Sequence, residues 1–145
     1  MTSGPRNASF AQQRLIAFAL LFGVGAYALV AAFVLQQNDG KGLQPELPAE
    51  LADVALLLGP AMLVAGLVLR TVMNRRAEAL PVDERAPLRF QAMLLPMAVL
   101  EAGALFGITI WMLCGKAVPS LAIALVLFAA MIAIVPLRDP DEGAR

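Results

Sequence analysis

The sequence predicts an all-α integral membrane protein, a four-helix bundle in which antiparallel helices run up and down in turn. The chain has 145 residues, of which 60% are hydrophobic and 15% charged, and its mean hydropathy is +0.77. Soluble domains carry about 25% charged residues. The apolar residues form long runs, and none of these runs alternates with the period of two that a membrane β-strand shows. Helices are therefore expected, because only helices and closed barrels span a bilayer.

The first two expected spans come before the middle loop. Residues 15–35 contain no charged residue, and at about 1.5 Å per residue they cover about 30 Å, the thickness of a hydrocarbon core. Residues 51–73 form the second span, with Asp53 and Arg70 near its two ends. Pro60 lies inside this span, and because proline cannot donate a helical hydrogen bond, we expect a kink there.

The third and fourth expected spans follow the middle loop. Residues 90–115 form the third span, which holds Pro96 and one carboxylate, Glu101, near its middle. Pro96 leaves a backbone carbonyl without its helical donor, so a second kink is expected. Residues 117–137 form the fourth span and complete a single transmembrane domain over 1–145.

The basic residues predict the orientation of the bundle. All nine arginines lie in the N-terminal region, in the middle loop with its flanks, or in the C-terminal region, whereas the other two connections carry only Lys41 and Lys116. Short cytoplasmic segments of membrane proteins are enriched in such residues. Both termini and the middle loop are therefore expected in the cytoplasm. The expected location is the cell membrane, of the bacterial inner-membrane type.

Composition also argues against several functions. The chain has no histidine, one cysteine and a formal net charge of zero. We expect no enzyme activity and no metal or cofactor site, because these residues do not assemble a nucleophile with its base or a set of metal ligands. The absence of a basic patch predicts no nucleic-acid partner.

Glu101 is a carboxylate inside an apolar span, and the function of spanning a membrane does not require it. It lies twelve residues after Arg89, which places it about 18 Å along the helix and close to the bilayer midplane. An ionised carboxylate at that depth costs about 2.5 kcal/mol or more. We therefore expect a neutral glutamate that accepts a hydrogen bond from Tyr27, which the same reckoning from Arg14 places at nearly the same depth. Glu101 and Tyr27 form the candidate proton or ion site.

Small residues predict close packing between the helices. Gly103 and Gly107 form a Gly-x-x-x-Gly pair on the third span, and Gly59 and Gly66 lie on the second. Residues without a side chain let two helix backbones approach each other. General helix packing is the expected role of these four glycines, and a specific dimer motif is the alternative.

The stretch LEAGALFGITI, at Leu100–Ile110, resembles the ion-binding helix of the c subunits of rotary ATPases, the proteolipids. In that family a carboxylate is followed by alanine and then by aliphatic, aromatic, small and aliphatic residues in a similar order. Glu101 matches the acid that carries the ion, and its companions match Ala102, Phe106 and Gly107. The resemblance implies that Glu101 binds a proton or cation.

A second motif agrees with this resemblance, while the spacing departs from it. RAP, at Arg85–Pro87, resembles the family's cytoplasmic Arg-x-Pro loop. The interval from Pro87 to Glu101 is about one helical turn shorter than in the family. The second span also lacks the family's dense Gly-x-Gly-x-Gly run, and two further spans flank the hairpin.

Two functions follow from these residues. The expected function is a structural or accessory subunit of a membrane complex, in which Glu101 forms a hydrogen bond between helices. The alternative is a proton- or cation-handling protein, c-subunit-like or a small transporter, that uses Glu101. Scarce polar residues along the spans favour the first, and the frequent functional use of intramembrane acids favours the second. The expected partners are the lipid bilayer and either further copies of this chain or a larger membrane complex.

Overall fold

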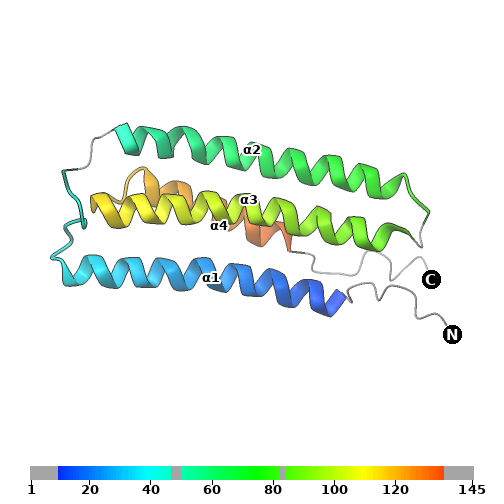
Figure 1. Cartoon of the computed structure of the whole chain (residues 1–145), viewed down its shortest axis with the longest axis horizontal. Coiled ribbons are helices and arrows are strands. Elements are labelled where there is room, and N and C mark those ends of the chain that lie inside the picture. The colour runs from blue at the N-terminus through cyan, green and yellow to red at the C-terminus, as the bar shows by residue number, and fades with distance from the viewer. Residues whose placement is uncertain (1–9, 47–49, 82–83, 136–145) are drawn as a thin grey trace.

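The structure is a computed structural model that describes residues 10–46, 50–81 and 84–135. The expected all-α class is confirmed for this part of the chain, which forms four helices. Successive helices run in opposite directions along the long axis of the molecule (Figure 1). The helices are α1 (Phe10–Gln37), α2 (Glu50–Glu78), α3 (Arg85–Cys114) and α4 (Ser120–Ile134).

Three of the helices are long and apolar enough to cross a membrane. Within the described residues these candidate spans are Ala11–Gln37, Asp53–Glu78 and Arg85–Cys114. The fourth expected span, 117–137, corresponds to the shorter apolar helix α4, which has 15 residues and a length of about 22 Å. The helix begins at Ser120, directly after Pro119, a residue that suits a helix start because the first backbone donors have no helical partner. The end of this expected span lies outside the described residues.

α3 is the central helix of the fold. It contacts α1, α2 and α4, and half of its apolar stretch is buried, against 17% in each of α1 and α2. α2 and α3 continue without a break through Pro60 and Pro96, the two positions of the expected kinks. The fully buried core joins three helices and includes Ala17 and Ala31 of α1, Met97, Leu100 and Ala104 of α3, and Leu127 and Met131 of α4.

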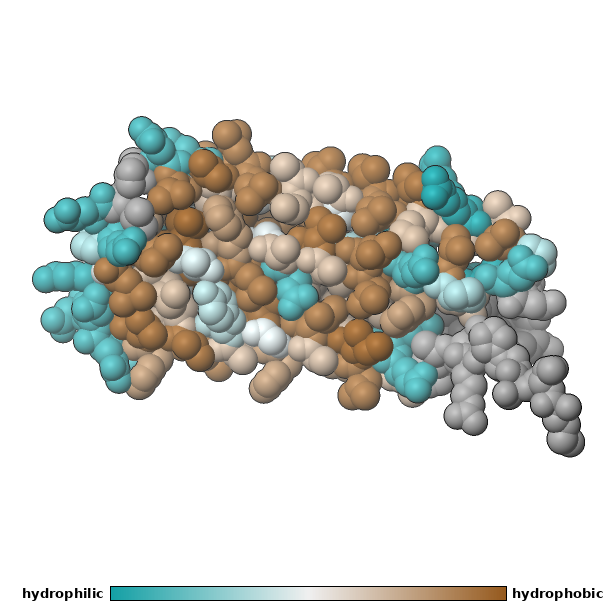
Figure 2. Space-filling model, viewed as in Figure 1, coloured by the Kyte–Doolittle hydropathy of each residue, from teal (hydrophilic) through white to brown (hydrophobic). Residues whose placement is uncertain are grey.

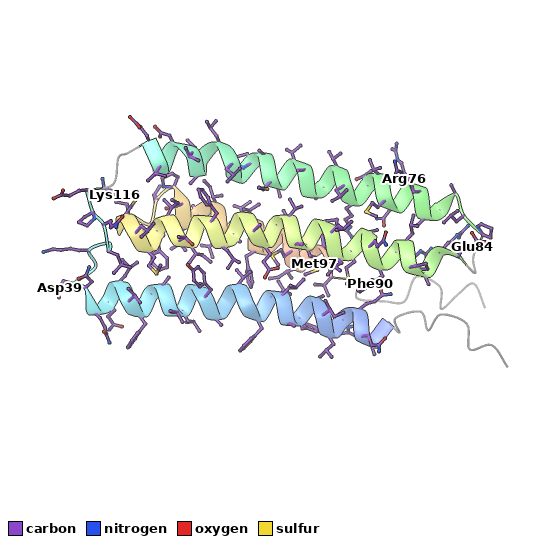
Figure 3. The ribbon with its side chains drawn as sticks, in the orientation of Figure 1. Asp39, Arg76, Glu84, Phe90, Met97 and Lys116 are labelled. Carbon is purple, nitrogen blue, oxygen red and sulfur yellow. The ribbon has the colours of Figure 1, made fainter. Side chains whose placement is uncertain are left out.

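The surface between the two ends of the molecule is hydrophobic. Large apolar side chains remain exposed, among them Phe22 at 77% and Leu57 at 75%. Figure 2 shows a broad hydrophobic band with hydrophilic residues gathered at both ends. Lys116 lies at one of these ends and Arg76 at the other (Figure 3). In water each Å² of this exposed apolar surface is unfavourable by about 25 cal/mol, a penalty that hydrocarbon surroundings remove.

The loop between α1 and α2 binds the end of α3. The backbone amide of Leu43 donates to the carbonyl of Met112 at 3.1 Å, and that of Gln44 donates to the carbonyl of Leu113 at 2.9 Å. Carbonyls in the last turn of a helix have no partner within the helix, so these bonds satisfy them. The loop thereby fixes the adjoining end of α1 to α3.

Two glycines make this close approach possible. Gly115 ends α3 in the left-handed conformation, with φ of 72°. Gly42 lies against the backbone of Leu113 and Cys114 so closely that a Cβ at this position would overlap them. A side chain at Gly42 would therefore push the loop away from α3.

Candidate functional site

Glu101 lies about halfway along α3, beside α1. Its Oε1 lies 3.9 Å from the position that a Cβ of Gly23 would occupy. The side chain is half-buried, and among the described residues it has no hydrogen-bond or ion-pair partner. Gly23 was not singled out from the sequence, because nothing in the residue order shows that it lies beside the acid.

Glu101 lies at the surface of the bundle, next to α1. Glu101 is half-buried, and Gly23, which lies beside its carboxyl group, is exposed. Glu101 is the only charged residue in the central part of the four described helices. The carboxyl group therefore reaches the outer surface where α1 and α3 meet.

The structure pairs Tyr27 with Thr109 and not with Glu101, which corrects the expected hydrogen bond. The Tyr27 hydroxyl lies 3.0 Å from Thr109 Oγ1. Thr109 Oγ1 donates to the carbonyl of Leu105 at 2.7 Å, and a carbonyl can only accept. Tyr27 must therefore donate to Thr109, and its only hydroxyl proton is not available to Glu101.

The register of α1 against α3 explains this correction. The sequence estimate aligned the two helices at Arg14 and Arg89, as if both arginines lay at one depth. In the structure Gly23 lies beside Glu101, so Tyr27 lies about 6 Å, one helical turn, further along. Arginine side chains are long enough to reach an interface from several backbone depths, which makes them poor markers of register.

Gly103 and Gly107 lie on the part of α3 that faces the other helices. A Cβ at Gly103 would come within 2.8 Å of the Leu127 side chain of α4 and 3.1 Å of Met62 of α2. A Cβ at Gly107 would come within 3.2 Å of Ala124 of α4. The Gly-x-x-x-Gly pair is therefore occupied by contacts within this chain.

Gly59 and Gly66 take the matching positions on α2. The side chain of Ile123, on α4, fills the space in which a Cβ of Gly59 would lie. A Cβ at Gly66 would come within 3.1 Å of the Leu100 side chain of α3. All four glycines thus lie where a neighbouring helix of the same chain passes.

Arg85, which opens the RAP motif, stabilises the end of α2. Its Nε donates to the carbonyl of Leu80 at 2.7 Å, and its terminal nitrogen donates to the carbonyl of Glu78 at 3.2 Å. A cation that binds the last carbonyls of a helix also interacts favourably with the helix dipole. In this structure Arg85 is the first residue of α3, and its contacts are structural.

Comparisons with known proteins assign this chain to no family. No family model, no curated protein and no solved structure matches the chain. Within the described residues no group of three His, Cys, Asp or Glu side chains is placed to hold a metal ion. Among the described residues the candidate site therefore consists of one unpaired carboxyl group, Glu101, with Gly23 beside it. Tyr27 lies about one turn further along α1, and its partner Thr109 lies about two turns beyond Glu101 on α3.

Proposed function

We propose that the protein is a multi-pass protein of the cell membrane, with its four helices embedded as an antiparallel bundle. Its N- and C-terminal regions and its α2–α3 loop face the cytoplasm. The three long apolar helices support this, as does the gathering of arginines at one end. α4 is shorter than the hydrocarbon core, and a bilayer adapts to such a helix by local thinning.

Reporter fusions test this orientation. A phosphatase reporter, active only outside the cytoplasm, is expected to be inactive after Arg145 and active when inserted after Lys41. A fluorescent reporter that folds only in the cytoplasm is expected to give the opposite pair of results. Phosphatase activity after Arg145 would overturn the orientation.

We further propose that the chain is a structural or accessory subunit, which associates with other transmembrane helices at the junction of α1 and α3. One observation carries this proposal: the carboxyl group of Glu101 opens onto the outer surface halfway along α3 and has no partner among the described residues. A polar group in hydrocarbon is costly until it is hydrogen-bonded. Hydrogen bonds between membrane helices contribute about 0.6 to 2 kcal/mol each, so a neighbouring helix that supplies one is favoured.

A matched pair of variants tests the accessory role. The wild-type chain, extracted in mild detergent, is expected to migrate as an assembly larger than one copy. Glu101→Gln is expected to keep this assembly because the amide both donates and accepts, whereas Glu101→Leu is expected to weaken it. Val64→Leu, an exposed position on α2, serves as the control. A Glu101→Leu chain that assembles like the wild type would refute the role of the carboxyl group.

Proton or cation handling at Glu101 is the second candidate, supported by the same unpaired carboxyl. The surroundings give it less support. The side chains between Glu101 and the arginine-rich end are apolar, and Figure 3 shows Met97 and Phe90 there, between α3 and α1. On the other side, Tyr27 and Thr109 are already bonded to each other.

Transport by proteoliposomes decides between the two functions. If the chain carries protons, vesicles that contain it will show a proton flux under an imposed potential, and Glu101→Gln will abolish that flux. The accessory role predicts no flux above that of empty vesicles. Labelling by a hydrophobic carbodiimide, which modifies protonated carboxyl groups, provides the control that Glu101 is present at the lipid-facing surface.

A further inference from the structure

We propose that the surface around Glu101 binds a second copy of this chain, so that the two Glu101 carboxyl groups hydrogen-bond each other across a two-fold axis normal to the membrane. The inference rests on the proposed function and names the partner in that association. The surface, termed the Glu101 face, comprises five residues: Ala19 and Gly23 of α1, and Ala98, Glu101 and Ala102 of α3.

Orientation and depth select a second copy as the partner. The arginine distribution gives every copy the same orientation in the membrane. A two-fold axis along the membrane normal then places equal residues of two copies at equal depth. A neutral carboxyl group has both a donor and an acceptor, so two such groups complement each other. Two copies related in this way therefore satisfy both Glu101 side chains at once.

No other group on the described surface offers Glu101 a partner at its depth. The exposed polar side chains of the described helices lie towards their ends, for example Gln91 of α3 and Thr71 of α2. A head-to-tail contact, in which the Glu101 face meets a different surface of the second copy, would leave the carboxyl group against apolar side chains. The two-fold contact is the arrangement that avoids this cost.

The shape of the Glu101 face permits the approach. Ala19, Gly23, Ala98 and Ala102 are all exposed and carry at most one side-chain carbon. Ala19 lies one turn before Gly23, and Ala98 one turn before Glu101 and Ala102, so both pairs of small residues share the open side. Small residues let helix backbones come close, and this close approach brings the Glu101 side chains of the two copies within reach of each other.

The more familiar dimer motif of this chain is not free. Gly103 and Gly107 face Leu127 and Ala124 of α4 within the same chain. A second copy cannot reach this pair without displacing α4. The Glu101 face, in contrast, has no side chain of the described residues over Gly23 apart from Glu101 itself, at 3.9 Å.

Cross-linking of the full chain in its membrane tests the contact with Glu101 intact. In a Cys114→Ser background, Ala98→Cys is expected to form dimers with a short bis-maleimide linker. Val64→Cys is the matched control, because Val64 lies on α2 between Met62 and Gly66, which contact α3 on either side of the level of Glu101. Dimers from Ala98→Cys that do not exceed those from Val64→Cys would overturn the proposal.

A binding measurement tests the hydrogen bond itself. Two differently labelled populations of the chain, mixed in vesicles, report the self-association constant by energy transfer. Glu101→Leu is expected to lower this constant by about 3- to 30-fold for each interhelical hydrogen bond of the carboxyl pair, and Glu101→Gln is expected to restore most of it. An association constant equal in all three chains would refute the carboxyl pair.

The outcomes separate this inference from the accessory role. One outcome is that Ala98→Cys gives no homodimer, while the detergent-extracted chain binds a different membrane protein in fixed stoichiometry and Glu101→Leu abolishes this binding. In that case self-pairing is wrong and the accessory role stands. If cross-linking gives no dimer and the detergent-extracted chain is a monomer without any partner, both proposals fail. Homodimers that depend on Glu101 support both.

Discussion

Towards α2 and α4, α3 packs through glycines, whereas α1 packs on the bundle through its own alanine and valine residues and one polar pair with α3. On the first side a Cβ at Gly103 would come within 2.8 Å of Leu127. On the second side, Gly25 of α1 has nothing within 4 Å of where its Cβ would lie, and Gly23 has only Glu101, at 3.9 Å. The glycines of α1 are thus not packing residues within this chain.

The difference shows how α1 is held. Ala17, Val24 and Ala31, spaced by seven residues, are buried in the core on α1, whose main contact is with α3. A spacing of seven residues, the heptad repeat, places the residues along one line of contact between two packed helices. The hydrogen bond from Tyr27 to Thr109 adds to it. α2, α3 and α4 form the closely packed part of the molecule, and α1 is joined to it along a narrower contact that leaves Glu101 at its edge.

The largest effect is expected from the closely packed side. Leu100 is fully buried beside Gly66, and Leu100→Ala should lower the free energy of unfolding by about 2 to 5 kcal/mol, because it opens a cavity. Leu29 of α1 is 74% exposed, so Leu29→Ala should change it by less than about 0.5 kcal/mol. Unfolding in mixed micelles measures both. Equal losses would mean that the two sides do not differ.

A pair of glycine variants sharpens the same contrast. Gly107→Ala places a Cβ 2.8 Å from the carbonyl oxygen of Ser120, so α4 must shift, and a loss of about 1 to 3 kcal/mol is expected. Gly25→Ala meets open space and should raise the free energy of unfolding by up to about 1 kcal/mol, through helix propensity. A loss at Gly25 comparable to that at Gly107 would contradict the comparison.

The sequence predicts the helices well because charged residues mark their ends and the runs between them are apolar. The shortening of the fourth span to α4 was missed, since composition alone does not show where a helix begins after a turn at Pro119. Glu101 could be singled out because a charge in an apolar run is costly wherever the run packs. The residues around Glu101 could not be predicted, because they depend on the register between α1 and α3, which no local sequence pattern determines.

Thr109 is a second residue whose surroundings depend on how α1 and α3 pack and cannot be read from the sequence. It lies eight residues from Glu101 on α3, and its partner is Tyr27, on a helix far away in the sequence. The residue order also gave no sign that Gly103 and Gly107 turn towards α4 and that Gly23 turns away from it. Glycines look alike in a sequence, and the neighbours that give each its role come from other helices.

The Tyr27–Thr109 pair allows a smaller, specific test of the α1 contact. Tyr27→Phe and Thr109→Val should each lower the free energy of unfolding by about 0.6 kcal/mol, and by no more than about 1.7 kcal/mol, the range of hydrogen bonds between membrane helices. The double variant should lose little more than Thr109→Val alone, because both changes remove the bond between the two hydroxyl groups and only Thr109→Val also removes the bond to the Leu105 carbonyl. Additive losses would show that the two hydroxyl groups act independently.

The smallest effect is expected from Glu101→Ala, measured on the monomer at high dilution. Glu101 has no hydrogen-bond partner among the described residues, so its removal breaks no bond within the described fold. The desolvation of the carboxyl group also cancels, since the helices of an unfolded membrane protein stay in the hydrocarbon phase. The free energy of unfolding should therefore change by less than about 0.5 kcal/mol, less than the change for Tyr27→Phe. A loss as large as that of Tyr27→Phe would mean that Glu101 has a partner inside its own chain, and the surface where α1 and α3 meet would then have no unpaired group to offer another helix.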